Sequence, residues 1–202
     1  MINFIIGKKE NIDKKDKDVS YMKILENDGD FYELRKFKGK IDEIYDSCLI
    51  KAENVEKLRK FIDKASNFFS KIIVLGTSDK INRTVLEHKK TWALLNPEQA
   101  HESDRDYDSY RNSGLNHILC KIASDNKKII LISLDELRNT KQLGRVIQNL
   151  RLCKKYKTPV FSINLNEDKS DLKTLFEIKE IERVLMKGEH FERKRINTIL
   201  CA

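Results

Sequence analysis

Glycine, proline, cysteine and histidine are all scarce in this chain of 202 residues, which has Gly 7, Pro 2, Cys 4 and His 4. The glycines form no phosphate-binding loop, and no serine or cysteine stands in a recognisable nucleophile motif. Cys48, Cys120, Cys153 and Cys201 form no Cys-x-x-Cys pair, so they indicate small reduced core residues and not a zinc site or a disulfide framework.

Long apolar runs are also missing, and none approaches the length of a membrane span. The opening MINFIIG is too short and uncharged for a signal peptide. We therefore expect a soluble cytoplasmic protein without a membrane partner.

Basic residues outnumber acidic ones, 40 to 32, which gives a formal charge of +8. The excess is uneven, because residues 1–46 hold 10 basic and 11 acidic residues and the remainder holds 30 and 21, a balance of +9. A basic bias favours a polyanionic partner, nucleic acid before membrane. A Lys-rich surface without such a partner remains an open alternative.

Short apolar runs alternate with segments of helical period along most of the chain. Expected strands cover residues 2–6, 47–50, 72–75, 92–95, 129–134 and 159–163. Expected helices cover 55–69, 77–86, 112–123 and 133–156, with closing helices over 171–186 and 189–199. The pattern over 19–37 is weaker and favours a helix to Asn27, a turn at 28–30 and then a strand. Strands that are apolar throughout favour a parallel sheet covered on both faces, either a barrel or a doubly wound sheet.

The stretch from Asn112 to Ala123 is the sharpest local pattern. Asn112 and Ser113 can cap a helix whose apolar stripe is Leu115, Ile118, Leu119, Ile122 and Ala123. His117 lies off that stripe and is either a general acid–base or, as we favour, a structural histidine that donates to the preceding loop. That loop, residues 99–111, carries His101 and four acids; a metal cluster is conceivable, but a solvated loop is the better interpretation.

The segment from Arg138 to Lys157 is the clearest charge feature. It holds seven basic residues and no acidic one, namely Arg138, Lys141, Arg145, Arg151, Lys154, Lys155 and Lys157. A solvated helix normally mixes signs to form i,i+4 pairs. An all-basic helix is tolerable where phosphates supply the counter-charge. The helix dipole is an alternative explanation for the lysines at the end of the segment only.

Three stretches resemble the protein component 3 family of archaeal ribonuclease P, the counterpart of the thirty-kilodalton subunit of the nuclear enzyme. They are NPE at 96–98, RNSGLNHILCKIA at 111–123 and RVIQNLRLCKKYKTPV at 145–160. The structural motif that matches the family consists of Asn96, Pro97, Ser113, Gly114 and His117. The resemblance runs from about Ile44 to Met186.

The resemblance implies an α/β fold, an incomplete TIM-like (β/α) barrel that is a metal-free relative of the PHP-type barrels. One such domain would span residues 1–202, with a divergent part at 1–46 and a basic helix or tail at 187–202. It also implies a role in removing the 5′ leader from precursor tRNA. The ribonuclease P RNA would hydrolyse the phosphodiester with bound Mg²⁺, and this chain would hold no catalytic residue, metal or cofactor.

The implied partners are the ribonuclease P RNA, protein component 2, other protein subunits and precursor tRNA. Arg83, Arg111, Lys127 and Lys128 are the RNA contacts that the resemblance implies, and the basic segment adds Arg138, Lys141 and Arg145. Two alternatives stay open. One is a metal-dependent phosphoesterase on a similar barrel, and the other is an RNA-binding or scaffold domain outside ribonuclease P.

Overall fold

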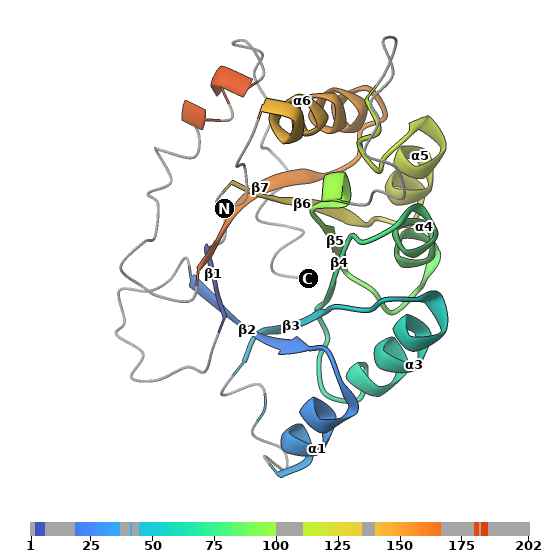
Figure 1. Ribbon diagram of the computed structural model, residues 1–202, viewed down its shortest axis with the longest axis vertical. Coiled ribbons are helices and arrows are strands. Elements are labelled where there is room, and N and C mark those ends of the chain that lie inside the picture. The colour runs from blue at the N-terminus through green and yellow to red at the C-terminus, as the bar shows by residue number, and fades with distance from the viewer. Residues whose placement is uncertain are drawn as a thin grey trace.

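Seven parallel strands form one closed barrel in the computed structural model, which describes residues 3–6, 19–36, 41, 45–99, 111–134, 140–166, 180–181 and 183–185 (Figure 1). The strands are β1 (Asn3–Ile6), β2 (Val19–Leu25), β3 (Ser47–Ile50), β4 (Ile72–Leu75), β5 (Ala93–Leu95), β6 (Ile129–Ser133) and β7 (Val160–Asn166). Neighbours in the sequence are neighbours in the barrel, and β1 pairs with both β2 and β7. With one strand fewer than the eight-stranded TIM barrel, this confirms the predicted incomplete barrel.

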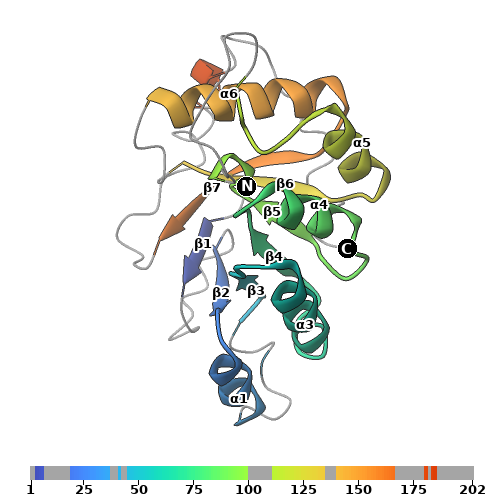
Figure 2. The ribbon, with the colours of Figure 1, turned by 45° about the vertical axis from the view of Figure 1, so that its right-hand side comes forward.

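Helices cover the outside of the barrel. They are α1 (Asp28–Lys36), α3 (Val55–Ala65), α4 (Asp79–Glu87), the 3-10 helix η1 (Pro97–Gln99), α5 (His117–Asp125) and α6 (Thr140–Lys155). Figures 1 and 2 show α3, α4, α5 and α6 side by side along the outer face of β3 to β7, with α1 at the end of the molecule beyond β2. α3 starts at Val55 as predicted, with the side chain of Asn54 as its cap. α4 starts at Asp79, two residues after the predicted start, with the side chain of Ser78 as its cap.

Alternate residues of a strand face opposite sides of the sheet. In β3, β4, β5 and β6 the residues on both sides are largely apolar and buried. The barrel interior is filled by one buried cluster, made of Met22, Leu49, Ile73, Ala93, Leu95, Ile129, Leu131 and Ile163. A larger cluster, to which Phe61, Ile72 and Leu119 belong, lies between the strands and the helices. The interior of the described strands is therefore a packed core, as in other (β/α) barrels, and not a cavity for a substrate.

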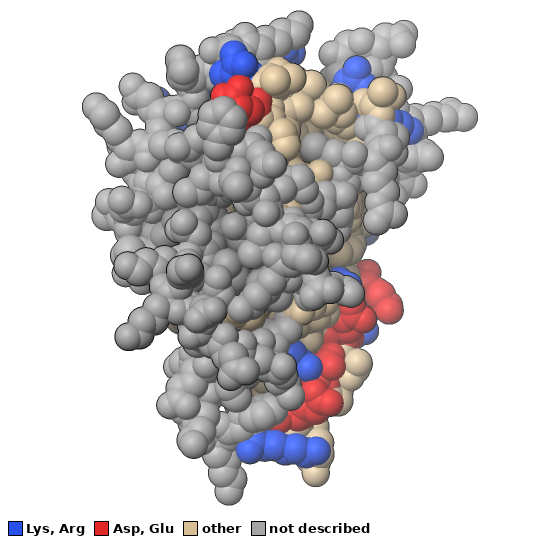
Figure 3. Space-filling model, turned by 90° about the vertical axis from the view of Figure 1, so that its left-hand side faces the viewer, with Lys and Arg blue, Asp and Glu red and all other residues tan. Residues whose placement is uncertain are grey.

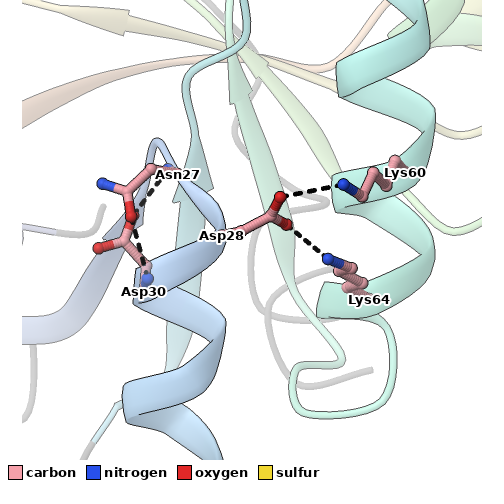
Figure 4. Close-up of polar contacts among 5 residues, drawn as sticks. All are labelled: Asn27, Asp28, Asp30, Lys60 and Lys64. Atoms are coloured by element: carbon pink, nitrogen blue, oxygen red, sulfur yellow. Dashed lines mark hydrogen bonds and ion pairs between the residues drawn. The ribbon is translucent and has the colours of Figure 1, made fainter.

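The prediction for residues 19–37 is wrong in its order of elements: the strand comes first and the helix second. The side chain of Asn27 accepts from the N–H of Asp30 at 3.2 Å, and the carboxylate of Asp30 accepts from the N–H of Asn27 at 2.9 Å (Figure 4). This reciprocal pair caps a helix, so Asp28 to Asp30 form its first turn and not a loop. Asp28 then joins α1 to α3 through Lys60 at 3.0 Å and Lys64 at 2.5 Å.

Of the other sequence predictions, some are confirmed, one is wrong and several lie outside the described residues. Ser133 is the last residue of β6 and not the cap of the next helix, which begins at Thr140 in the described ranges. Cys48, Cys120 and Cys153 are free and buried, as predicted. The closing helices fall almost entirely outside the described residues, as do the tail 187–202 and the loop 100–110 with His101. A membrane span would need a longer and more apolar helix than any found in the described part.

Candidate nucleic-acid interface

The site is built at the carboxyl end of β5. Asn96 has a φ of 48° and is fully buried. Its N–H donates to the carbonyl of Leu131 at 2.8 Å, and its Oδ1 accepts from the N–H of Ser133 at 2.7 Å. Asparagine tolerates this left-handed backbone and bonds locally, so it ends β5, fixes the turn against β6 and lets Pro97 open η1.

Gly114 packs against the chain at Pro97. Its φ is +72°, and a Cβ at this position would overlap the carbonyl oxygen of Pro97. The buried side chain of Asn82 on α4 joins the same two residues, because its Nδ2 lies 3.1 Å from the Gly114 oxygen and 3.4 Å from the Pro97 oxygen. A glycine is therefore required at position 114 by both the backbone conformation and the close approach.

Two amides of α6 hold the other side of this segment. Asn149 donates to the carbonyl of Ser113 at 2.8 Å. Gln148 donates to the Ser113 hydroxyl at 2.9 Å and to the carbonyl of Arg111 at 2.7 Å, and it accepts from the N–H of Arg111 at 2.8 Å. We call the set Asn82, Asn96, Pro97, Ser113, Gly114, Gln148 and Asn149 the clasp. It joins α4, β5, the start of α5 and α6 into one unit.

The clasp places Arg111 on the surface of α6. Arg111 is exposed, and its guanidinium lies over Gly144, where a Cβ would come within 2.5 Å of the guanidinium carbon. Lys141, Gly144 and Gln148 share one face of the helix, because they are three and seven residues apart. Arg111 and Lys141 are therefore brought to the same face of α6, next to the clasp.

The start of α5 differs from the sequence prediction. The helix begins at His117, and its cap is Asn116, whose side chain accepts from the N–H of Leu119 at 2.9 Å. Neither Asn112 nor Ser113 is the cap. The buried face is rotated accordingly, so that Cys120 is buried while Ile118 is 52% exposed.

His117 is exposed at the first position of α5, and its side chain forms no hydrogen bond with another described residue. The expectation that it anchors the preceding loop stays a prediction, because residues 100–110 lie outside the described part. Within the described part, Gln148 and Asn149 bond to Arg111 and Ser113 from α6. Asn82, Gln148 and Asn149 were missed as site residues. A signal was available for two of them, because Asn82 and Asn149 are amides at positions of the apolar helical stripe, next to Ile81 and Leu150.

The structure divides the predicted RNA contacts. Lys128 is only 5% exposed, and its ammonium donates to the carbonyls of His88 at 2.6 Å and Thr91 at 2.5 Å. Burial lowers the pKa of Lys128. Arg145 is only 2% exposed, on the inner face of α6. The structure corrects both predictions, because neither cation is at the surface.

The remaining predicted contacts lie in different places. Arg83 is exposed on α4 and forms an ion pair with Glu87 at 2.8 Å. Lys127 is exposed at the end of α5, before β6, so it lies at the opposite end of the barrel from Arg111. Arg138 lies outside the described residues. The basic segment is thus not a single basic face.

Groups suited to metal chemistry do not gather in the described residues, where no three His, Cys, Asp or Glu side chains could hold one ion. His88 follows α4 at the amino end of β5, and burial lowers its pKa. Acidic side chains gather instead toward the α1 end, where Figure 3 shows them beside a few basic ones. Those with described partners are Glu26, Asp28 and Glu33, which form ion pairs with lysines.

Comparison with known proteins gives one consistent result. No family model matches the chain. It is 32% identical over 123 residues to ribonuclease P protein component 3 of Methanococcus vannielii, covering 58% of this chain and 49% of that protein. It is 32% identical over 120 residues to the same component of Methanosarcina acetivorans, covering 56% and 46%. For that of Methanocaldococcus jannaschii the identity is 26% over 150 residues, covering 71% and 61%.

The chain therefore spans about half the length of most of the curated relatives it matches. Among solved structures, it resembles a chain of the cryo-EM structure of archaeal ribonuclease P with mature tRNA, with a TM-score of 0.65 and 22% identity. The match covers 93% of this chain and 84% of the other, and at this identity it supports the fold. The similarity to archaeal ribonuclease P protein component 3 that the sequence motifs indicated is confirmed.

Proposed function

We propose that this chain is a protein subunit of ribonuclease P that supports the catalytic RNA in removing the 5′ leader from precursor tRNA. The observation that carries the proposal is the similarity to protein component 3 of several archaea. The subunit would act in the cytoplasm with the ribonuclease P RNA, precursor tRNA, protein component 2 and other protein subunits.

The chain itself is non-catalytic under this proposal, and the RNA carries out the hydrolysis with its own bound Mg²⁺. Two features of the described residues support this division of labour. The barrel interior is apolar, and the amides of the clasp are engaged with backbone groups. In the described part of the chain, such an interior supplies rigidity to the surface that would contact RNA.

The proposed RNA contacts at the carboxyl end of the barrel are Arg111 and Lys141. The clasp fixes the backbone of Arg111 through Gln148, so a phosphate contact at this residue loses little conformational freedom. The guanidinium fork suits bidentate phosphate binding. Arg83 stays a proposed contact, although a phosphate there must compete with Glu87.

A metal-dependent phosphoesterase is the alternative. Such enzymes need several His and Asp ligands at strand ends, and none of the four histidines of the chain lies on a described strand. A stoichiometric transition metal in the purified protein would favour this alternative.

Omission from the reconstituted enzyme tests the proposal. The RNA and protein subunits are assembled with and without this chain, and precursor-tRNA cleavage is measured over a series of magnesium concentrations. We expect the chain to raise the cleavage rate most at low magnesium. An unchanged rate at every magnesium level would overturn the proposal, and would favour a scaffold domain that acts elsewhere.

A further inference from the structure

Three loops lie at the amino ends of β5, β6 and β7 and, with the last residues of α6, are rich in lysine. Residues 88–91, 126–128 and 154–158 contain seven lysines and no acid. They are Lys89, Lys90, Lys127, Lys128, Lys154, Lys155 and Lys157. The register pairs Ala93 with Ile129 and Ile130 with Val160, so the three strands start side by side. The loops therefore lie next to each other, at the opposite end of the barrel from the clasp.

Side-chain hydrogen bonds fix these loops against each other and against the neighbouring helices. The ammonium of Lys128 holds the carbonyls of His88 and Thr91 in the first loop. Asn126 donates to the carbonyl of Leu86 at 2.9 Å, and Thr158 donates through its hydroxyl to the carbonyl of Cys120 at 2.8 Å. The other six lysines are exposed, and we call them the lysine edge. Because their backbones are fixed by these bonds, they are arranged before any partner binds.

Two of these lysines adopt a backbone conformation that favours glycine. Lys127 and Lys157 both have a φ of 55°. In each case the next N–H reaches back to the carbonyl five residues earlier, from Lys128 to Ala123 at 2.8 Å and from Thr158 to Cys153 at 2.9 Å. This is the Schellman ending, whose left-handed position is usually glycine. Two neighbouring helices thus keep a lysine where glycine would be less strained.

Acidic side chains of the described residues do not neutralise most of the lysine edge. Lys90 pairs with Asp63 at 2.7 Å, and Lys155 lies 5.6 Å from the ring centre of Tyr156. Lys89, Lys127 and Lys157 have no acidic partner in the described part of the chain. The helix dipole favours cations in the last turn, where Lys154 and Lys155 already stand without backbone strain. It gives no reason for a strained lysine two positions after the helix ends, as at Lys127 and Lys157.

We propose that the lysine edge binds the phosphate backbone of a structured RNA, as a second RNA-contacting surface at the end of the barrel opposite Arg111. Ammonium groups are compact point charges and match phosphates without reading bases, so the contact is independent of RNA sequence. Lys71 and Trp92, which precede β4 and β5, extend the same end of the barrel, and the Lys71 ammonium lies 5.7 Å from the ring centre of Trp92. The inference rests on the proposed function for the identity of the RNA.

Two charge-matched triple variants of the full chain test the inference. The first is Lys89→Gln, Lys127→Gln and Lys157→Gln in the lysine edge. The control is Arg35→Gln, Arg59→Gln and Lys80→Gln, which removes three exposed basic residues on α1, α3 and α4. The probe is a labelled transcript of the ribonuclease P RNA, and its dissociation constant is measured over a series of KCl concentrations. Thermal unfolding of both variants verifies that they fold.

Every phosphate that a variant no longer neutralises reduces the slope of log K against log salt by about 0.7–0.9. We expect the slope of the lysine-edge variant to be smaller by about two to three units. Its affinity should then fall on the order of a hundredfold at about 0.1 M salt, while the control keeps the wild-type slope. An equal reduction in both variants, or no reduction in either, overturns the inference.

Failure of the lysine edge and failure of the proposed function give different results. If omission of the chain slows cleavage but the lysine-edge variant binds RNA with the wild-type slope, the surface is wrong and the subunit role stands. If omission has no effect but the slope falls in the lysine-edge variant alone, the surface is supported and the ribonuclease P role is not.

Discussion

Gly114 packs directly against the carbonyl of Pro97: a Cβ at position 114 would lie 1.8 Å from that carbonyl oxygen, whereas real Cβ atoms essentially never come within 3.0 Å of another heavy atom. The two residues come from opposite ends of the segment between β5 and α5, and Asn82 donates to the carbonyl of each. This contact holds the two ends of the segment together. The position of Arg111 depends on it, because Ser113 and Arg111 precede Gly114 in the same run of backbone that Gln148 binds.

Gly114→Ala should destabilise the protein strongly. The left-handed backbone costs an L-residue about 1–2 kcal/mol, and the overlap with the Pro97 carbonyl adds to that cost. We expect a decrease of about 2 kcal/mol or more in the free energy of unfolding, measured by urea titration. Gly29→Ala is the matched control, because its Cβ would meet a single side-chain atom, Oδ1 of Asn27, at 2.9 Å, and no backbone atom outside its own helix. A small shift of that side chain relieves the contact, and alanine favours the helix, so stability should change by less than about 1 kcal/mol. Equal effects of the two variants would contradict the close approach at Gly114.

Gly144→Ala should separate RNA binding from stability. A Cβ at position 144 would displace the guanidinium of Arg111 from the surface of α6. Alanine is the better helix former, by about 0.5–1 kcal/mol, so the variant should be at least as stable as the wild type. The affinity for ribonuclease P RNA should nevertheless fall.

A double-mutant cycle controls this prediction. Arg111→Ala should weaken RNA binding, and Gly144→Ala should then have no further effect on the dissociation constant, because the group it displaces is gone. If the two effects add fully, Gly144 influences binding by another route than Arg111.

The sequence predicted the repeating part of the fold well, because β3, β4, β5 and β6 are largely apolar runs and each helix from α3 to α5 has a stripe of helical period. It failed at residues 19–37, where β2 includes charged Lys23 and where Asp28, Gly29 and Asp30 resemble a turn. The interaction that decides the fold there is the reciprocal pair of hydrogen bonds between Asn27 and Asp30, which caps a helix. Asn and Asp residues beside a glycine are equally typical of a turn, so the sequence alone does not distinguish the two structures.

The site was predictable in its position but not in its contacts. Asn96, Pro97, Ser113 and Gly114 were identified by motif, and the structure brings them together. The charge of Lys128 and Arg145 gave no sign that both cations are buried, because burial is decided by the neighbouring loop and helix. Gln148 and Asn149 bond to residues more than thirty positions earlier in the chain (|i−j| of 37 and 36), a relation that helical period alone does not contain.

Acid should weaken the contact between α1 and α3. The hydrogen bonds from Lys64 and then Lys60 hold the pKa of Asp28 at about 2, below its ordinary value of 3.8 (Figure 4). Since the folded-state pKa is depressed, this contribution to stability is present above pH 3.8 and disappears as the pH falls through about 2. Asp28→Asn should therefore be less stable than the wild type near neutral pH, and the difference should close as the pH approaches 2 in urea titrations.

The two lysine partners provide the control for the acid effect. Lys64→Gln should raise the pKa of Asp28 more than Lys60→Gln, because the bond to Lys64 is the larger cause of the shift. The pKa is measured by NMR titration of the carboxyl carbon. A pKa of Asp28 that neither substitution moves would show that these ion pairs are not formed in solution, as is common for exposed pairs.

The double substitution Lys127→Gly and Lys157→Gly should weaken RNA binding without unfolding the protein. Glycine relieves about 1 kcal/mol of left-handed strain at each position. The greater freedom of glycine in the unfolded chain, about 0.5–1 kcal/mol, and the missing cation at the helix end, about 0.3–1 kcal/mol, offset that gain. The free energy of unfolding should thus stay within about 1 kcal/mol of the wild type, while the salt slope of RNA binding falls by about 1.5. Reduced stability with an unchanged slope would mean that these lysines serve the helix ends, and would remove the strained backbone as an argument for RNA contact.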